Sequence, residues 1–538
     1  MRLKCSPPRE ARGGAGEGAR RGRNEARRGG TIPVWESAKA DFGPLLPRSR
    51  GFIRPGRDAG HIELKQDHSH LARHQIFSQH TSSIRMATVT SSPAKSRPRP
   101  AEAPQAPPPD AARYVRAFRA IAGLAFLASL ALSYPLWVGS RDYPLVPLIP
   151  GLQLPAPLDA VLFGAMCLAL LGAALLPRPN RFLVAVPAIG VVWAVLDQSR
   201  WQPYLAWYLT AAVCLLLAER SPTASGMKQA AEWALAPVQL LTCCMYVYSG
   251  LHKLNHHYLT TDFILTVRPL LGWLHVTPST LPAGAVHGAA LASALAELGL
   301  GALLMAPRGR RAAVIGLTAI HAFILLMIGP LGAGWNRVVW PWNVAAVAAL
   351  WLLFWPAAPY ERLRAFVRAW WKRDGAGKRG AAAAVPRPQR LAWNAVLVLF
   401  GAMPALSFVG LWPASLSFRL YAGKERIALI YYDAKQPGAL PPAALAASRA
   451  PGEVNLLAWS QAELNAAPVM DDRVLLGIGR SLARRSPAGV VGLLIASEPA
   501  LLTGRRTTRF FVFRGPALEP VDASAEYTVE LHEDTGAR

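Results

Sequence analysis

Residues 312–328 read AAVIGLTAIHAFILLMI, a run in which only Thr318 and His321 carry polar side chains. A helix needs ~20 predominantly apolar residues to cross roughly 30 Å of bilayer hydrocarbon, and this run comes close to that length. Arg310 and Arg311 directly precede the run, as is common where a helix enters a membrane from a basic loop. The stretch therefore predicts a transmembrane helix.

Comparable apolar runs recur from residue 120 to residue 411. The third, fourth and eighth are short, at roughly 13–15 residues, and would need interface residues to complete a span. A further stretch, 263–274, contains Arg268 and Pro269 and suits an interfacial or re-entrant segment. The predicted spans are 120–138, 158–176, 182–196, 204–217, 231–251, 284–305, 312–328, 343–355 and 391–411. The sequence thus predicts an α-helical polytopic membrane bundle of about nine helices over residues 113–414.

Composition and charge agree with a membrane protein. Hydrophobic residues make up 52% of the chain, which is high for a soluble protein, and many of the 17 Trp lie near the ends of apolar runs. The formal net charge of +26 could also indicate nucleic-acid binding. However, many positive charges lie in the first 119 residues and in the short connections between runs. We therefore expect the lipid bilayer, and not nucleic acid, as a partner.

The front of the chain, residues 1–112, is rich in Arg, Gly, Pro, Ser and Ala and has no sustained apolar period. Such a segment buries too little apolar surface to offset its ordering entropy, so we predict that it is disordered. No apolar segment follows Met1, so a cleavable signal peptide is not predicted. Met86 begins an ordinary polar tail, and we expect the first 85 residues to be absent from the native protein.

The basic residues of the connecting loops predict the orientation. Loops 177–181, 218–230, 306–311 and 356–390 hold 16 Lys or Arg. The alternate loops 139–157, 197–203, 252–283 and 329–342 hold 5. Basic loops stay in the cytoplasm. We therefore expect a multi-pass protein of the cell (inner) membrane, with its N-terminus cytoplasmic and its C-terminal region extracytoplasmic.

Residues 415–538 differ in character from the rest of the chain. The short β-prone runs IALIYY, VNLLAW, VVGLLIA, RFFVF and YTVEL alternate with turn-forming residues, and a helix is expected over 472–484. This pattern predicts a small C-terminal α+β or β-rich extracytoplasmic domain. It contains no catalytic motif, and the whole chain lacks a P-loop, a nucleophile elbow and an HExxH sequence.

Polar residues at membrane depth are costly and are therefore candidate functional residues. The densest group, YVYSGLHKLNHHY, spans residues 246–258 at the end of the fifth run. Lys253 could act as a base if burial favoured its neutral amine, although it could instead extend to the lipid headgroups. His252 and His256 share a helical face, but their spacing matches no zinc signature, so no metal site is predicted.

Other candidates lie in or beside the remaining runs, most of them on the predicted outer side. Glu297 could be a proton relay or a packing contact, and His321 could serve chemistry or bond a neighbouring helix. The candidate catalytic residues are Lys253 and His321. The candidate substrate-binding residues are Asp197, His252, Asn255, Glu297, Asn336 and Trp340.

The stretch SGLHKLNHHY, residues 249–258, resembles a motif of the HTTM domain, the membrane domain shared with vitamin K-dependent γ-glutamyl carboxylase. The carboxylase stretch is AGVKKLDADW-like, and alignment on Gly250 and Leu254 places its catalytic lysine on Lys253. A family histidine in a later helix corresponds to His321. The resemblance covers about residues 113–356, and DoxX-like and MauE-like membrane proteins are more distantly similar. It implies a base that acts on a reduced quinone.

The chain also departs from the carboxylases. His252 replaces the first lysine of the motif, and Asn-His-His at 255–257 replaces Asp-Ala-Asp. Two hypotheses follow. The chain is an enzyme that acts on a quinol-like, lipid-soluble substrate at the outer face, with Lys253 as base. Alternatively, it is a non-catalytic scaffold or assembly factor whose C-terminal domain binds an extracytoplasmic protein partner. Transport is less favoured, because no convincing repeat is present.

Overall fold

The computed structural model describes residues 2–6, 111–219, 224–371, 387–436, 438–486, 490–514, 520–522 and 528–532. The chain divides into one unit of Met1–Ala38 with Pro109–Arg538 and another of Lys39–Pro108. All described residues belong to the first unit. The segment predicted to be disordered, with Met86, lies outside the described residues except for 2–6, 111 and 112.

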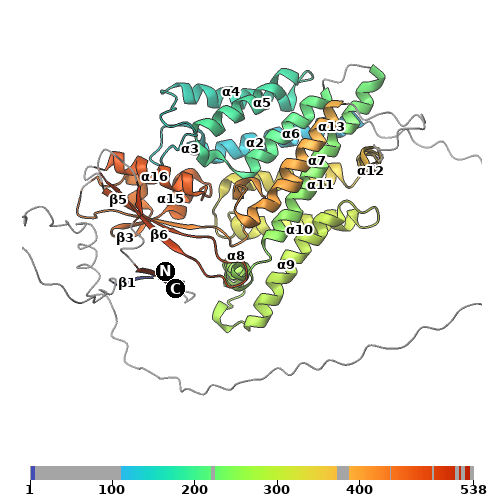
Figure 1. The fold of residues 1–538 in the computed structure, drawn as a ribbon. Helices are drawn as coiled ribbons and strands as arrows, with labels where there is room; N and C mark the ends of the chain where they lie inside the picture. Colours follow the sequence, from blue (N-terminus) through green and yellow to red (C-terminus); the bar gives the residue numbers. More distant parts are fainter. Residues whose placement is uncertain are drawn as a thin grey trace, which may run out of the picture. The chain divides into compact units, whose positions relative to one another are not determined.

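A helix is present at each of the predicted spans (Figure 1). These helices are α2 (Ala111–Leu132), α4 (Leu158–Leu175), α5 (Asn180–Leu196), α6 (Pro203–Glu219), α7 (Ala224–His252), α9 (Ala283–Leu303), α10 (Arg310–Ile328), α11 (Trp340–Leu353) and α13 (Arg387–Val396). Two more lie between them, α8 (Phe263–Trp273) at the predicted interfacial stretch and the unpredicted α12 (Ala357–Trp371).

Within the part of the chain that the structure describes, five helical segments are long and apolar enough to cross a membrane. They are Arg113–Leu132, Leu158–Leu175, Ala283–Leu303, Arg310–Ile328 and Arg387–Val409. Three apolar helices are shorter, namely Asn180–Leu196, Pro203–Leu217 and Arg337–Leu353. The helices support a membrane protein, whereas the predicted count of nine spans is not confirmed.

The surfaces of these helices carry apolar side chains. Only 22% to 44% of the residues in the five most apolar segments are buried within the protein. Leu168 is 68% exposed, Val161 62% and Ile315 55%. A soluble monomer rarely exposes so much apolar surface, whereas lipid tails accept it without cost. The exposed faces therefore support the membrane assignment independently of helix length.

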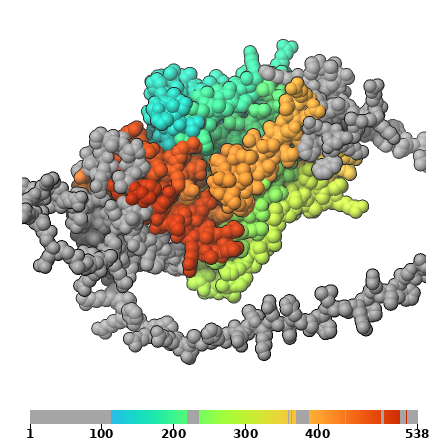
Figure 2. Space-filling view, in the orientation of Figure 1, coloured from blue at the N-terminus to red at the C-terminus, as the bar shows by residue number. Residues whose placement is uncertain are grey.

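Two predicted spans are interrupted. In the first predicted span, α2 ends at Leu132 and the short helix α3 (Tyr134–Trp137) follows Ser133. The helix breaks here because Pro135 lacks the amide hydrogen that a continuous helix needs. The last begins as α13 and continues as the π-helical segment η7 (Leu397–Ala402) and the 3₁₀ segment η8 (Met403–Val409), with Pro404 at its start. Figure 2 shows this segment, in orange, running between the cyan-green and the yellow-green helices.

The C-terminal domain contains a six-stranded antiparallel sheet in the order β3-β4-β2-β5-β6-β7. Its strands are β2 (Ile427–Tyr431), β3 (Ser448–Ala450), β4 (Glu453–Asn455), β5 (Val490–Ala496), β6 (Thr508–Arg514) and β7 (Pro520–Asp522). The helices α15 (Leu456–Leu464) and α16 (Asp472–Arg485) pack on this sheet (Figure 1). A separate pair joins β8 (Thr528–His532) to β1 (Arg2–Ser6).

Most elements predicted in this domain are present, with one exception. The run VNLLAW, predicted as a strand, is a strand only as far as Asn455 and then begins α15. The side chain of Asn455 accepts hydrogen bonds from the backbone amides of Leu457 and Ala458. This arrangement is a helix N-cap, and it overrides the β propensity of the run.

The C-terminal domain contacts all four loops that the charge pattern placed on one side. In loop 139–157, the backbone amide of Asp142 donates a hydrogen bond to the carboxylate of Glu463. In loop 197–203, the side-chain amide of Gln202 donates to the carbonyl of Ala467. Loops 252–283 and 329–342 make similar bonds through Asn255 and Asn336. These four loops therefore lie at one end of the helical bundle, together with the C-terminal domain. We call it the domain end.

Candidate functional site

Lys253 follows the last residue of α7 and forms a buried ion pair with Glu297 of α9. Its Nζ atom lies 2.6 Å from Oε2 of Glu297 and also donates to Oγ of Ser249 at 2.9 Å. Both charged side chains are 9% exposed. Such a pair in a membrane segment is costly unless the charges satisfy each other, and this is the usual mark of a functional site.

Small residues bring the two helices of this pair together. A Cβ atom at Gly250 of α7 would overlap the backbone of Leu298, and one at Gly301 of α9 would overlap Tyr246. Ala294 of α9, beside Gly250, is completely buried. Close approach through small residues is a common way for membrane helices to associate. It places Lys253 within reach of a carboxylate that lies 44 residues away in sequence.

His321 of α10 links two further polar side chains. Its Nε2 atom lies 2.6 Å from the hydroxyl of Tyr246, and its Nδ1 atom lies 2.7 Å from Oδ1 of Asn343. The Nδ2 atom of Asn343 donates to the carbonyl of Val339 at 2.8 Å, which turns Oδ1 toward the ring. The network therefore assigns the proton of His321 to Nδ1, so that Nε2 accepts the hydrogen bond of Tyr246.

The two sets of contacts form one group. Tyr246 and Ser249 lie on one face of α7, and Lys253, directly after the helix, bonds to Ser249. Both Glu297 and Lys253 act electrostatically on His321. We call this group the membrane cluster, which consists of Tyr246, Ser249, Lys253, Glu297, His321 and Asn343. It contains an amine, a carboxylate, an imidazole and a phenol, and it can therefore move protons within a buried site.

His252 and Asn255 flank the membrane cluster without joining it. The His252 ring stacks on Phe408, with ring centroids 4.4 Å apart, and its Nε2 atom lies 3.3 Å from Oγ of Ser407. The Nδ2 atom of Asn255 donates to the carbonyl of His252 at 2.8 Å and to that of Ala422 at 2.7 Å. These two residues therefore hold the end of α7 against the segments that follow it.

Asn336 and Trp340 form hydrogen bonds to residues outside the membrane cluster. Asn336 adopts a left-handed backbone with φ of 51° and donates from Nδ2 to the hydroxyl of Tyr421 at 2.9 Å. The indole of Trp340 donates to the carbonyl of Trp335. The same segment does supply the membrane cluster, but through Asn343. The polar and aromatic residues of the sequence pointed to the right segment. In the structure, however, Asn343 is the side chain of this segment that contacts the membrane cluster.

Asp197 belongs to a separate group at the domain end, which we call the loop cluster. Its Oδ2 atom lies 2.5 Å from Nη2 of Arg141, and its Oδ1 atom accepts from the amides of Val146 and Ser199. Arg200 lies 3.8 Å from the same carboxylate and donates to two backbone carbonyls. Burial lowers the pKa of Arg200 to about 10. The loop cluster is thus a fully bonded connection between spans.

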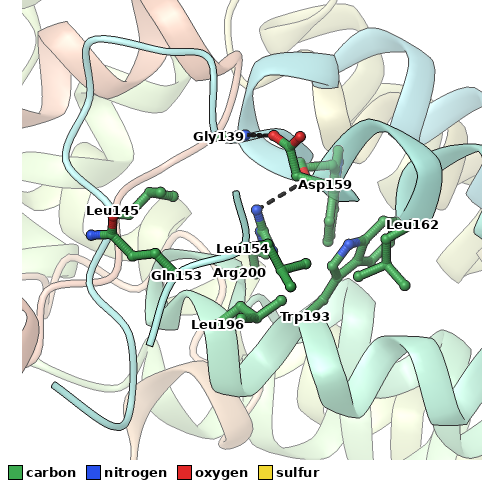
Figure 3. A pocket seen from close by; sticks show the side chains of 10 residues that line it. Gly139, Leu145, Gln153, Leu154, Asp159, Leu162, Trp193, Leu196 and Arg200 are labelled. Carbon is green, nitrogen blue, oxygen red and sulfur yellow. Dashed lines mark hydrogen bonds between the residues drawn. The ribbon is translucent and has the colours of Figure 1, made fainter. Parts of the chain in front are cut away.

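A small pocket of about 20 Å³ lies beside the loop cluster (Figure 3). Arg200, Asp159 and Trp193 line it, and Asp159 accepts a hydrogen bond from the amide of Gly139. The Nε1 atom of Trp193 is buried and has no hydrogen-bond partner among the described residues. The pocket has a polar end and an apolar wall of leucines. Its lining residues all lie between 137 and 200, so it shares no residue with the membrane cluster.

Several members of these clusters were not predicted from the sequence. Tyr246 and Ser249 share a helical face with Lys253, and that spacing could have identified them. Arg141 carried no comparable signal, because its partner Asp197 lies 56 residues away. Among the described residues, no three His, Cys, Asp or Glu side chains could hold a metal ion together. Comparisons with protein-family models, curated proteins and solved structures found no match to this chain.

Proposed function

We propose that this protein is a membrane-embedded enzyme that removes a proton from a quinol-like, lipid-soluble substrate, with Lys253 as the base. The observation that carries the proposal is the buried pair of Lys253 and Glu297, 2.6 Å apart, within a group of other proton-transfer residues. The resemblance of residues 249–258 to the HTTM motif supports the same residue and the same substrate class.

The carboxylate of Glu297 provides a way to generate the free amine. In the ion pair, Lys253 holds the proton and cannot accept another. Transfer of one proton from Nζ to Oε2 leaves a neutral amine beside a neutral carboxylic acid, and burial favours the neutral forms. The amine then accepts the proton of a substrate hydroxyl, while Glu297 keeps the first proton until it is released.

Tyr246 and His321 offer a route for that release. Tyr246 takes up the proton of Glu297 as it passes its own proton to Nε2 of His321, and Asn343 stabilises the resulting charge through Nδ1. The residue that would become cationic is therefore already bonded on its far side, which is the usual support for a histidine in proton transfer. His321 is thus proposed to relay a proton and not to contact the substrate.

The proposed enzyme works from the outer face of a multi-pass protein of the cell membrane, with about nine spans and a cytoplasmic N-terminus. The excess of Lys and Arg in loops away from the domain end supports this orientation. A reporter fused after Arg538 should be active only outside the cytoplasm. Activity of a cytoplasm-specific reporter at that position would reverse the orientation.

The test uses the purified protein in nanodiscs with menadiol as the probe. Deprotonation gives the quinolate, which dissolved oxygen oxidises to the quinone, with two electrons reducing oxygen to hydrogen peroxide. An oxygen electrode should show faster consumption with the wild type than with Lys253→Met or Glu297→Gln, while Lys435→Met, at an exposed lysine, should match the wild type. Equal rates for the wild type and Lys253→Met would refute the base.

The scaffold hypothesis predicts a different pattern. A non-catalytic scaffold would show no acceleration of menadiol oxidation, and its cellular role would survive Lys253→Met. It would instead depend on the C-terminal domain, for which a partner would have to be captured with the full-length chain. The same set of variants therefore separates the two functions.

A further inference from the structure

Residues 421–424, Tyr-Ala-Gly-Lys, form a strap that crosses the domain end beside α7. The hydroxyl of Tyr421 accepts a hydrogen bond from Asn336, and the carbonyl of Ala422 accepts one from Asn255. Gly423 has φ of 70°, and a Cβ atom there would overlap the carboxylate of Asp262. Two separate loops, 252–283 and 329–342, thus fix the strap, and only glycine fits at its third position.

The strap delivers Lys424 to the end of α7. The residue is only 5% exposed, and its Nζ atom lies 4.9 Å from the centroid of the Phe408 ring. Phe408 in turn stacks on His252, the direct neighbour of Lys253 in sequence. The ammonium group of the C-terminal domain is therefore separated from the membrane cluster by a short stack of rings.

Other charged groups nearby already have partners. Glu297 pairs with Lys253, and Glu498 pairs with Arg419 at 2.7 Å. Lys424, Arg419 and Lys253 all act electrostatically on His252. Within the described residues, Lys424 forms no ion pair with a carboxylate, and burial and the nearby Arg419 lower its pKa. Glu498 and Glu425 act on Lys424 in the opposite direction, but only from a longer distance, so Lys424 is a buried ammonium group without a direct carboxylate contact among the described residues.

A buried cation without a direct carboxylate contact is costly, because distant charges compensate for only part of its lost solvation. The cation–π contact with Phe408 offsets only part of that cost. The strap nevertheless holds the cation in place through the hydrogen bonds of Tyr421 and Ala422 and the close approach of Gly423 to Asp262. Such an arrangement is expected where an anion forms during the reaction, since a preorganised charge stabilises it without rearrangement.

We propose that Lys424 stabilises the anion produced when Lys253 deprotonates its substrate, so that the C-terminal domain completes the site. The inference rests on the proposed function and extends it. The ligand class is an aromatic, lipid-soluble molecule with an ionised hydroxyl group, such as a quinolate. The role of the small domain is then to bring one cation and its strap to the membrane helices.

Two naphthoquinones that differ in charge provide the test. 2-Hydroxy-1,4-naphthoquinone is an anion at neutral pH, whereas menadione is neutral, and quenching of tryptophan fluorescence reports the binding of either. In the full-length protein, Lys424→Gln should weaken binding of the anion about tenfold or more, as expected for a lost charge-assisted contact. Menadione binding should change less than about twofold. Lys424→Arg should retain anion binding, and Lys435→Gln is the matched control at an exposed lysine of the same domain.

The outcomes are distinct. Equal weakening of both probes by Lys424→Gln, or unchanged binding of the anion, would overturn the inference while leaving the base proposal intact. Failure of the wild type to bind either probe would overturn the proposed function and the inference together. If Lys424→Gln does not fold, as judged by thermal unfolding, Lys424→Met keeps the aliphatic stem over Phe408 and gives the same comparison.

Discussion

Asp197 and Glu297 are both buried carboxylates that pair with basic side chains, but their surroundings differ. Asp197 accepts bonds from one guanidinium and two backbone amides, and a second guanidinium lies close by. Among the described residues, Glu297 has one charged partner, Lys253, and the Lys253 ammonium group donates to one other side chain, that of Ser249. A fully bonded carboxylate holds a loop in place, whereas a sparsely bonded one can exchange a proton.

The partners reinforce this difference. The guanidinium groups of Arg141 and Arg200 stay protonated near neutral pH, whereas a buried lysine amine can lose its proton. The loop cluster is therefore permanently charged, while the membrane cluster can become neutral. We infer that the buried carboxylate of Asp197 stabilises the fold, whereas that of Glu297 takes part in proton transfer. Four substitutions test that inference.

The largest effect is expected for Asp197→Ala. This change leaves buried guanidinium groups without their carboxylate and frees two loop amides, which should cost about 3–5 kcal/mol of unfolding free energy. Thermal unfolding in detergent measures the loss. Glu361→Ala is the control, because Glu361 is 57% exposed and its pair with Arg364 is weak. A similar change for both variants would contradict the structural role of the loop cluster.

A smaller loss is expected for Glu297→Leu, about 1.5–3 kcal/mol, because the unpaired Lys253 can shed its proton. The double variant Lys253→Met with Glu297→Leu should recover much of this loss, since two apolar side chains need no pairing. Unfolding of the wild type, both single variants and the double variant gives the coupling energy. Additive losses would show that the two residues are not coupled.

Asn343→Leu should cost less again, about 1–2 kcal/mol, because it removes one hydrogen bond from the His321 ring. It should also reduce menadiol oxidation, because Nδ1 of His321 would lose the acceptor that fixes its tautomer. Asn343→Asp keeps an acceptor at that position and should restore part of the rate. If Asn343→Leu lowers stability but not the rate, the relay through His321 is wrong.

The smallest effect is expected for Asp472→Ala in the C-terminal domain. Like Asp197, Asp472 contacts two arginines, Arg426 and Arg509, but the side chains are between 26% and 45% exposed. Exposed ion pairs contribute little, so the loss should stay below about 1 kcal/mol. Thermal unfolding again provides the measurement. A loss as large as that of Asp197→Ala would show that burial does not explain the difference between them.

Sequence reasoning located the helices well because a span needs a long apolar run, which is a local property. It failed where local signals compete, as at Pro135 and Pro404, which interrupt two predicted spans, and at Asn455, which caps a helix inside a β-prone run. It also identified Lys253, Glu297 and His321 individually, since polar residues stand out in apolar surroundings.

The apolar pattern of the sequence alone therefore determined the membrane class, the positions of the helices and the list of unusual polar residues. The tertiary structure decided which of those residues meet. Lys253 and Glu297 pair because small residues let α7 and α9 approach closely, and Asp197 instead meets Arg141 in another part of the chain. Contacts of this kind depend on how helices pack, and packing depends on many side chains at once.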